Sequence, residues 1–509
     1  MLAFTFIVLF LRVSTAQGEI RSFWQVTDFH HDPNYTKIGG DPNDRKMCHR
    51  DASDPNRTLG TFGSYHCDAP WTLVEHAIAG MAKIEQNPDF ILWTGDDGPH
   101  VPTSELSTPK VLRIISDITR ALLRYFPDTT FFPVLGNHDY YPKGAMPPEP
   151  NTIYEHVGSY WSNSSSRWLG DEETALFQKY GYYSSVYTPP GDTKTQPIRM
   201  LGLNTVYYYT QDKLTGNLPD PAGQFSWMEN ECKTARANGE KIFVIGHVPP
   251  GMFERSRNTS WFYPQFNKKF LEFLKNNVDV ISGNFFAHEH SDTFKVFRGK
   301  NLSAGVLFLA PAVTPWNTSL PGVGPNNPGI RLYDYDTATG RVVNIRQYWL
   351  NLTEANSRNE TDWTLEYRAT KRYGVPDVGG ASMIELAERF LKKGDSTFDA
   401  YYGFNSVSYD FSCDAKCKTT QVCSIMCVDY DEYYRCLNYP VNVTSICLPE
   451  TKNKDNDGGV FIPLYGKILI GVGGGAVVIA IVLMIVACRK KKSKERSPKP
   501  DSTEPLLDP

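Results

Sequence analysis

The strongest constraint on the fold is a series of five short polar motifs, each of which follows an apolar run. In chain order these motifs are Asp28-Phe29-His30, Gly95-Asp96, Gly136-Asn137-His138-Asp139, Gly246-His247 and His288-Glu289-His290. Loops that leave the ends of strands can converge on one pocket, so we expect the polar side chains to lie together. The Asp-x-His and His-x-His spacings also let alternate residues of an extended segment point to the same side. The series predicts layered sheets with one polar site at their edge.

The segments between the motifs predict a mixed α/β core. Apolar runs that are short enough for buried strands alternate with amphipathic stretches up to about residue 349, as a layered α/β protein requires. Predicted strands cover residues 23–26, 89–94 and 130–135, and predicted helices cover residues 71–86 and 111–125. The same alternation returns through residues 242–245, 270–274 and 278–281. The runs at 306–309 and 342–345 have no helix between them and predict antiparallel strands.

The motifs supply seven candidate metal ligands. Taken alone, Asp28 and His30 are more typical of a capped turn, and His247 of a histidine satisfied in the core. All five motifs in order, each after an apolar run, favour a metal centre instead. Nitrogen and oxygen donors in this ratio suit Zn, Fe or Mn better than Ca or Mg. The candidate ligands are Asp28, His30, Asp96, Asn137, His247, His288 and His290.

The two ends of the chain predict a membrane-anchored protein of the secretory pathway. An apolar run at residues 2–11, followed by small residues, predicts a signal peptide over residues 1–16, with an uncleaved anchor as the alternative. Residues 468–488 carry no charge and, as a helix of about 31 Å, would match a bilayer core. The basic run that follows predicts a cytoplasmic tail at residues 489–509. We therefore expect a single-pass type I protein, at the cell surface by default or in the endolysosomal membrane.

Sequons and cysteines agree with this topology. Nine of the ten cysteines precede residue 468, and six lie between residues 413 and 447, which predicts a disulfide-rich C-terminal subdomain. A zinc module is the alternative, but the cluster lacks paired C-x₂-C spacing. The predicted domains are therefore a catalytic domain at 17–352, a helical cysteine-rich subdomain at 353–450 with helices at 363–373 and 382–392, and a linker at 451–467. Predicted glycosylation sites are Asn34, Asn56, Asn163, Asn258, Asn301, Asn317, Asn351, Asn359 and Asn442.

The order of the motifs resembles that of the calcineurin-like metallophosphoesterase superfamily. Within it, five stretches are similar to the acid sphingomyelinase-like phosphodiesterases: Thr27 to His30, Thr94 to Asp96, Gly136 to Asp139, Gly246 to Gly251 and His288 to His290. The likeness covers roughly residues 20–450. It implies an α/β fold of the metallophosphoesterase type, in which two mixed β-sheets form a sandwich flanked by helices. It also implies two divalent metal ions at the sheet edge, for which we expect Zn²⁺.

The resemblance also implies a role for each motif residue. One ion would be held by Asp28, His30, Asp96 and His290, and the other by Asp96, Asn137, His247 and His288. His138 would contact the phosphate and, with a pKa near its ordinary value, protonate the leaving oxygen. His100 matches a second histidine beside the substrate. We expect disulfides between Cys48 and Cys67, Cys413 and Cys417, Cys423 and Cys436, and Cys427 and Cys447; the second and third of these pairings rest on the resemblance, and Cys232 stays free.

Three features depart from the family pattern. Ala287 stands where the family has glycine before its H-x-H motif. The few residues between Ala16 and Phe23 leave no room for a lipid-extracting saposin-like domain, and the chain has its own predicted transmembrane helix.

The predicted activity is hydrolysis of phosphoric diesters, because two cations can activate a water molecule and hold the phosphoryl oxygens.

The substrate stays open between several classes. We expect nucleotides, dinucleotides or phosphocholine-type small molecules, with sphingomyelin or another lipid phosphodiester as the alternative. An inactive surface receptor would predict missing ligands, yet all seven positions are filled. The aromatics Tyr140, Tyr141, Trp161 and Trp168 could equally stack a base or pack in the core. The formal charge of -4 argues against a nucleic-acid binder.

Overall fold

The computed structural model describes residues 18–41, 47–50, 54–163, 165–190, 195–317 and 323–449. The predicted signal peptide, linker, transmembrane helix and tail lie outside these residues. Within the described ranges, no helix has the length and apolar character needed to span a bilayer. All nine sequon asparagines are described, and none of them is buried.

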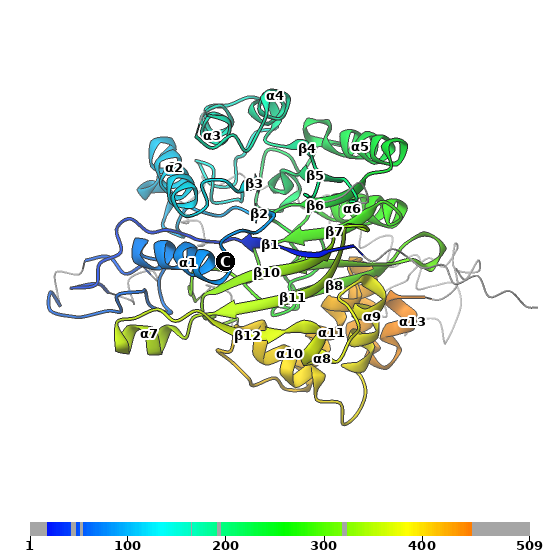
Figure 1. Ribbon diagram of the computed structural model, residues 1–509. Coiled ribbons are helices and arrows are strands. Elements are labelled where there is room, and N and C mark those ends of the chain that lie inside the picture. Colours follow the sequence, from blue (N-terminus) through cyan, green and yellow to red (C-terminus); the bar gives the residue numbers. More distant parts are fainter. Residues whose placement is uncertain are drawn as a thin grey trace, which may run out of the picture. The chain divides into compact units, whose positions relative to one another are not determined.

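Two six-stranded mixed sheets form the centre of the described chain (Figure 1). The first has the order β12-β11-β10-β1-β2-β3 and the second β4-β5-β6-β7-β9-β8. Parallel pairs join β1 to β2 to β3 in the first sheet and β5 to β6 to β7 to β9 in the second, and the remaining pairs are antiparallel. The strands are β1 (Ile20–Val26), β2 (Phe90–Trp93), β3 (Thr130–Pro133), β4 (Tyr183–Tyr187), β5 (Ile198–Gly202), β6 (Lys241–Ile245), β7 (Ile281–Phe286), β8 (Thr293–Arg298), β9 (Ala304–Leu309), β10 (Gly329–Asp336), β11 (Arg341–Trp349) and β12 (Thr364–Arg368).

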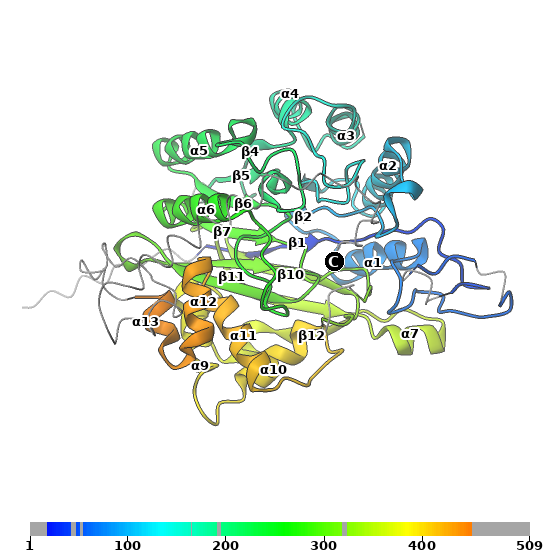
Figure 2. The same cartoon turned by 180° about the vertical axis from the view of Figure 1, so that it is seen from behind.

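Helices cover the sheets. In Figure 1, α2 to α5 lie along the upper part of the view, α1 lies at the level of β1 and β10, and the helices that follow β12 lie beside β8, β9 and β12, as the reverse view in Figure 2 also shows. The helices are α1 (Trp71–Ile84), α2 (Thr108–Tyr125), α3 (Thr152–Ser162), α4 (Asp171–Tyr180), α5 (Gln224–Asn238), α6 (Pro264–Asn277), α7 (Leu352–Arg358), α8 (Ala369–Tyr373), α9 (Gly380–Arg389), α10 (Thr397–Asn405), α11 (Ala415–Met426), α12 (Tyr430–Asn438) and α13 (Val443–Cys447).

The core between the sheets is rich in aromatic side chains. Phe23 of β1 stacks on Phe90 and Tyr333, with ring centroids 4.6 and 5.0 Å apart, and all three belong to the first sheet. Phe285 of the second sheet meets Phe23 edge-on at 5.4 Å. Aromatic pairs in these arrangements contribute about 0.5–1.5 kcal/mol beyond the burial of their area. These aromatic contacts pack β1, β2 and β7, which lead to three of the polar motifs, against one another in the core.

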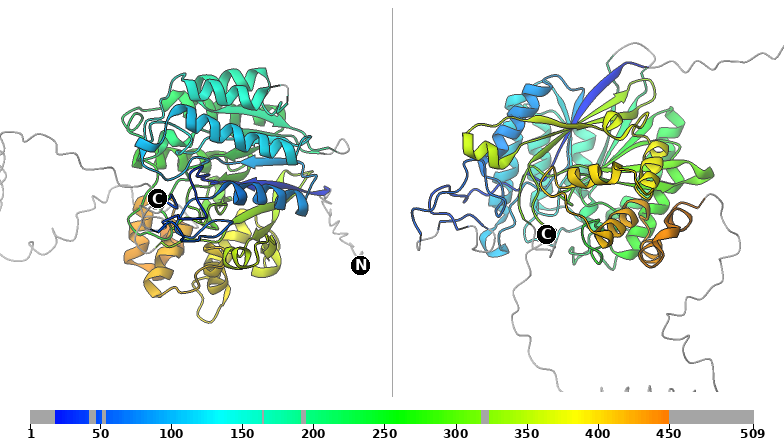
Figure 3. Two further views of the ribbon diagram at one scale, coloured as in Figure 1. Left: turned by 90° about the vertical axis from the view of Figure 1, so that its left-hand side faces the viewer. Right: turned by 90° about the horizontal axis from the view of Figure 1, so that it is seen from below.

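The structure refines one predicted helix and corrects another. Helix α2 begins three residues before the predicted start, because Ser107 caps it by accepting a hydrogen bond from Lys110 N. The predicted helix at 363–373 is wrong in its first half, which forms β12 and pairs with β11 at the edge of the first sheet. The buried Tyr367 holds this strand, and its hydroxyl donates to Asp292 Oδ2 at 2.7 Å. The C-terminal region thus contributes a strand to the first sheet (Figure 3).

The described residues contain four disulfides, and these join the cysteine pairs named above. Cys48 is bonded to Cys67 in the segment between β1 and α1. The other three connect residues of the C-terminal helices α11, α12 and α13 or lie next to them: Cys413 with Cys417, Cys423 with Cys436, and Cys427 with Cys447. Cys232 is buried and unbonded.

Candidate metal centre

The five motifs meet at one edge of the two sheets. Strands β1, β2, β3, β6 and β7 each end just before one motif. Their parallel arrangement within each sheet brings the carboxyl ends of the strands to the same edge, where α/β proteins form their sites. The structure brings six of the seven predicted ligands together, with His138 and His100 beside them: Asp28, His30, Asp96, His247, His288 and His290. The seventh, Asn137, lies in the loop after β3 next to His138, and all nine residues are buried.

The backbone of the motifs is held in an unusual conformation. Asp28, His30, Asp96, His288 and His290 have φ angles of 50, 39, 60, 72 and 57°, in the left-handed region that side-chain-bearing residues rarely adopt. Hydrogen bonds hold the first turn against the second, since Asp28 N donates to Gly95 O at 2.9 Å and His30 N donates to Asp96 O at 3.1 Å. Strain that is held in place this way is typical of functional sites.

Ala287 fits the H-x-H turn without strain of its own. It is not among the described residues with positive φ, so a glycine is not needed at this position. Its N–H donates to the carbonyl of His247 at 2.9 Å, which ties the loop after β7 to the loop after β6. The departure from the family pattern therefore leaves the turn intact.

One group of donor atoms surrounds His30. Its Nε2 lies 3.1 Å from Nε2 of His290, 3.5 Å from Oδ2 of Asp96 and 3.6 Å from Oδ1 of Asp28. The Nδ1 of His30 lies 2.7 Å from the carbonyl oxygen of Gly98 and donates to it, so the lone pair of Nε2 faces the group. Two imidazoles and two carboxylates at this spacing can hold one cation.

A second group shares Asp96 with the first. His247 Nε2 lies 3.0 Å from Asp96 Oδ2, and the ligand atoms of Asp96, His247 and His288 all lie within 4.8 Å of one another. The Nδ1 of His247 donates to the carbonyl of Thr94 at 2.7 Å, which again leaves Nε2 free to bind. Because Asp96 Oδ2 is close to His30 and to His247, this carboxylate stands between the two groups.

Polar atoms of this site are buried without hydrogen-bond partners among the described residues. Each such atom costs free energy, on the order of 1–3 kcal/mol, so a cluster of them requires an explanation. Cations bound to these lone pairs would explain why the atoms have no hydrogen-bond partner. The imidazole-rich donor set suits a transition metal or zinc. The atoms are Oδ1 of Asp28 and Asn137 and Nε2 of His100, His138, His247 and His288.

Opposite charges shape the protonation of this site. Burial alone would raise the pKa of Asp96, but the neighbouring histidines, His247 first, lower it to about 2. Burial alone would lower the pKa of His247, and the Asp96 carboxylate raises it to about 9. A carboxylate that stays ionised beside a protonated imidazole marks a position where a cation can take the place of the proton.

The expectation that His138 titrates near its ordinary pKa is wrong. Burial, with the positive charge of Lys143 and nearby histidines, lowers its pKa well below the usual value, and His100 is lowered by burial in the same way. Both imidazoles are therefore neutral in the free protein.

Comparison with known proteins agrees with this geometry. The family model for calcineurin-like phosphoesterases matches residues 21–292, and the model for the acid sphingomyelin phosphodiesterase C-terminal region matches residues 303–442. Human acid sphingomyelinase-like phosphodiesterase 3b is 40% identical over 427 residues, which cover 83% of this chain and 91% of the relative. The chain belongs to the acid sphingomyelinase-like phosphodiesterase family.

Two further relatives carry other names. The cyclic GMP-AMP phosphodiesterase SMPDL3A of Bos taurus is 38% identical over 426 residues, which cover 82% of this chain and 90% of the relative. The sphingomyelinase phosphodiesterase C of Dictyostelium discoideum is 36% identical over 415 residues, covering 79% of this chain and 89% of the relative. The chain is thus a phosphodiesterase with a metallophosphoesterase site.

Two carboxylates of this phosphodiesterase site were not among the sequence-predicted residues. Asp139 accepts hydrogen bonds of 2.8 Å from the backbone N–H groups of Gly136, Asp96 and Asp97, so it joins the second and third motif loops. Asp139 belongs to the third motif, so its position in that motif could have identified it from the sequence. Asp68 accepts from His100 N at 2.6 Å and from His100 Nδ1 at 2.9 Å. No local pattern marks Asp68, since only folding brings it to His100.

Aromatic side chains lie beside the candidate metal ligands and leave a gap of only about 10 Å³. Phe253, Trp261 and Trp316 line it together with His288 and His290. The ring of Trp316 also stacks on His100 with centroids 3.7 Å apart and planes 8° apart. One face of the Trp316 ring is therefore covered by His100.

The aromatic residues after the third motif serve mainly to pack the core. Trp161 and Trp168 are buried and lie 5.6 and 6.4 Å from the ring of Trp93 on β2. Tyr140 and Tyr141 are partly buried against the same core. Of the two readings left open for the tryptophans, the structure supports packing.

Proposed function

We propose that the chain is a metal-dependent phosphodiesterase that hydrolyses small phosphodiesters, most suitably nucleotide-type or phosphocholine-type molecules. The observation that carries the proposal is the convergence of buried, unpartnered imidazole and carboxyl lone pairs on one point at the sheet edge. Such a donor set is unfavourable unless cations are bound to it. The family's phosphodiesterase activity then follows from what paired cations do to a phosphate.

We assign two divalent cations to the site, with Zn²⁺ as the expected metal. Asp96 would be shared between them, because its Oδ2 lies between His30 and His247. When bound, the pair would withdraw charge from the phosphoryl oxygens and make a water molecule acidic enough to attack phosphorus. The first ion would take Asp28, His30, Asp96 and His290, and the second Asp96, Asn137, His247 and His288.

The neutral histidines have separate roles in this proposal. His138 N donates to Asp96 Oδ1 at 2.8 Å, which fixes the loop and leaves the imidazole Nε2 unpartnered. The negative charge of an arriving phosphate would raise the pKa of His138, so that it could donate a proton to the leaving oxygen. His100, oriented by Asp68 through Nδ1, would present its Nε2 to the substrate.

A nucleotide-type phosphodiester is the favoured substrate. The relative named cyclic GMP-AMP phosphodiesterase is 38% identical over most of its length, which supports a nucleotide. A lipid phosphodiester is the second candidate, favoured by the relative named sphingomyelinase phosphodiesterase C. An inactive receptor is not supported, because all seven ligand positions are filled.

The compartment belongs to the same proposal. Four disulfides and nine unburied sequon asparagines favour the secretory pathway. We keep residues 1–16 as a signal peptide, 468–488 as a transmembrane helix and 489–509 as a cytoplasmic tail, with the catalytic and cysteine-rich regions outside the cytosol.

A substrate panel tests the proposal. The purified full-length chain is assayed at pH 5 and pH 7 against a cyclic dinucleotide, a nucleoside phosphodiester, a choline phosphodiester and sphingomyelin. Chelator-treated and zinc-restored samples run in parallel. We expect the nucleotide substrates to be hydrolysed fastest, with activity lost on chelation and regained with zinc. Preference for sphingomyelin would select the lipid candidate, and hydrolysis that survives complete removal of metal would refute the site.

A further inference from the structure

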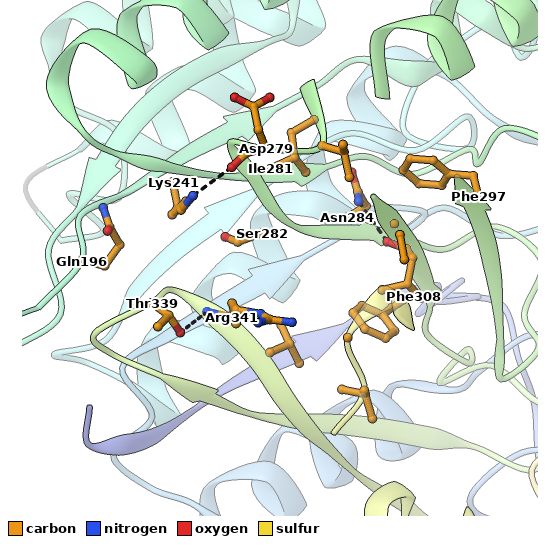
Figure 4. A pocket seen from close by; sticks show the side chains of 18 of the residues that line it. Gln196, Lys241, Asp279, Ile281, Ser282, Asn284, Phe297, Phe308, Thr339 and Arg341 are labelled. Atoms are coloured by element: carbon orange, nitrogen blue, oxygen red, sulfur yellow. Dashed lines mark hydrogen bonds between the residues drawn. The ribbon is translucent and has the colours of Figure 1, made fainter. Parts of the chain in front are cut away.

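A cavity of the described chain lies at the end of the sandwich opposite the candidate metal ligands. It has a volume of about 440 Å³ and is bounded by the first residues of β6, β7 and β9, the turn between β10 and β11, and the start of α9 (Figure 4). Lys241 opens β6, whose other end leads to His247, so a strand of roughly 16 Å separates the two places. A cavity of this size suits a small molecule.

One side of the cavity carries free positive charge. Within the described ranges, the Arg341 guanidinium has no ion pair or hydrogen bond. Lys241 Nζ makes one bond, of 2.9 Å, to the backbone carbonyl of Asp279. The carboxylate of Asp279 also lines the cavity, where it is bound by Arg236 at 2.6 and 2.8 Å, so the lining holds two cationic side chains and one anionic side chain that is already paired. The lining therefore has an excess of positive charge.

The other side of the cavity is apolar. Figure 4 shows Phe297 and Phe308 on the side away from Lys241, Gln196 and Thr339. Most of the remaining apolar lining is aliphatic: Val278, Ile281, Val306, Val342 and Val378. Aliphatic walls favour an acyl or alkyl chain over a nucleobase, which binds best between aromatic faces.

A buried hydrogen-bond acceptor also lines this cavity. Asn284 is 4% exposed, and its Nδ2 donates to the carbonyl of Val306 at 2.9 Å. Its Oδ1 has no hydrogen-bond partner among the described residues. An acceptor left in this state favours a ligand that brings a hydroxyl or another donor.

We propose that this cavity binds a small anionic amphiphile, a single aliphatic chain with an acidic head group. The head group lies at Arg341 and Lys241, the chain lies along the valine-rich wall, and a hydroxyl on the ligand donates to Asn284 Oδ1. A lysophosphatidic acid has all three features, and a fatty acid has the first two. The proposal does not depend on the substrate of the metal centre, because the two sites share no residue.

Photolabelling of the purified full-length chain tests the proposal. The probe is dodecyl phosphate with a photoreactive diazirine near the end of its chain, and labelled peptides are mapped by mass spectrometry. We expect labels in residues 278–309. Dodecanoyl lysophosphatidic acid and dodecanoate serve as competitors, and the stronger of the two identifies the source of the amphiphile. Dodecanol, AMP and inorganic phosphate serve as competitors that lack either the charge or the chain.

Two arginine variants distinguish the loss of a charge that lines the cavity from a general effect of arginine substitution on the fold. Arg341→Gln removes the unpaired guanidinium and should weaken labelling by about 10- to 100-fold, the effect of losing one charged hydrogen bond. Arg368→Gln is the matched control, because Arg368 is exposed on β12 and does not line the cavity. It should label like the wild-type chain, and both variants should keep their phosphodiesterase activity. Equal labelling of the two variants, or displacement by dodecanol or AMP as strong as by the anionic amphiphiles, would overturn the proposal.

Discussion

Replacing Asp96 with asparagine tests the shared position in the metal centre. The change keeps the shape of the side chain and an oxygen that can accept from His138 N, which Asp96 Oδ1 does at 2.8 Å. It also suits the backbone, since Asp96 has a φ of 60° and asparagine tolerates that region well. What disappears is one negative charge, 3.0 Å from His247 Nε2 and 3.5 Å from His30 Nε2.

The size of the effect follows from the charge that is lost. Two unit charges about 4 Å apart interact with roughly 4 kcal/mol at an effective dielectric constant of 20. Losing one such interaction weakens the binding of an ion by about 10³-fold, since each 1.4 kcal/mol is a factor of ten. We therefore expect the Asp96→Asn variant to retain at most one ion per chain, and its turnover to fall by about 10³-fold or more.

Metal content and turnover are measured on the same preparations. Inductively coupled plasma mass spectrometry gives metal ions per chain, and hydrolysis of bis(p-nitrophenyl) phosphate gives the rate. Asp97→Asn is the matched control, because the Asp97 carboxyl accepts from Trp93 Nε1 at 3.1 Å and does not belong to either donor group. It should keep both ions. If Asp96→Asn binds two ions per chain and hydrolyses the ester at the wild-type rate, the shared-carboxylate arrangement is wrong.

Three further predictions concern other parts of the chain. His138→Gln should leave the metal content normal and lower the rate by about 10²–10⁴-fold, which parallel metal analysis and kinetics will check; loss of metal would contradict it. Burial raises the pKa of Glu432 from 4.5 to about 7, so its stabilising contribution is complete below pH 4.5 and lost as the pH rises through 7. Glu432→Gln should therefore match the wild-type free energy of unfolding at pH 4 and exceed it at pH 8 by about 1–2 kcal/mol, and a difference of the same size at both pH values would refute this. Replacing Cys48 and Cys67 together with alanine should cost about 3 kcal/mol in denaturant unfolding, and an unchanged midpoint would contradict the contribution of this disulfide.

The central strands could be predicted from the sequence because they are short and buried on both faces. A continuous apolar run such as Phe90–Trp93 has few alternatives to a buried strand once polar residues bound it. An edge strand leaves no such pattern. Thr364–Arg368 alternates polar and apolar residues over five positions, too few to separate a strand from a helix, and only pairing with β11 decides.

The residues of the site likewise divide into those marked by local sequence and those brought together only by folding. The predicted ligands could be found because each stands within a few residues of a strand end, so local sequence carries the signal. Asp68 and Trp316 could not be found, because their relation to His100 arises only when distant loops fold together. The low pKa of His138 was also out of reach, since it depends on how completely the folded chain excludes water from this side chain.

The position of β1 in the first sheet has a consequence for how the chain is made. This strand is the first to leave the ribosome, and its antiparallel register pairs Ile20 with Asp336. Until β10 has been synthesised, one edge of β1 has no partner and its aromatic side chains lack part of their packing. Pairings between segments so distant in sequence form slowly and leave apolar surface exposed in the meantime. Biogenesis of this enzyme should therefore depend on chaperones that hold the nascent chain until its tenth strand arrives.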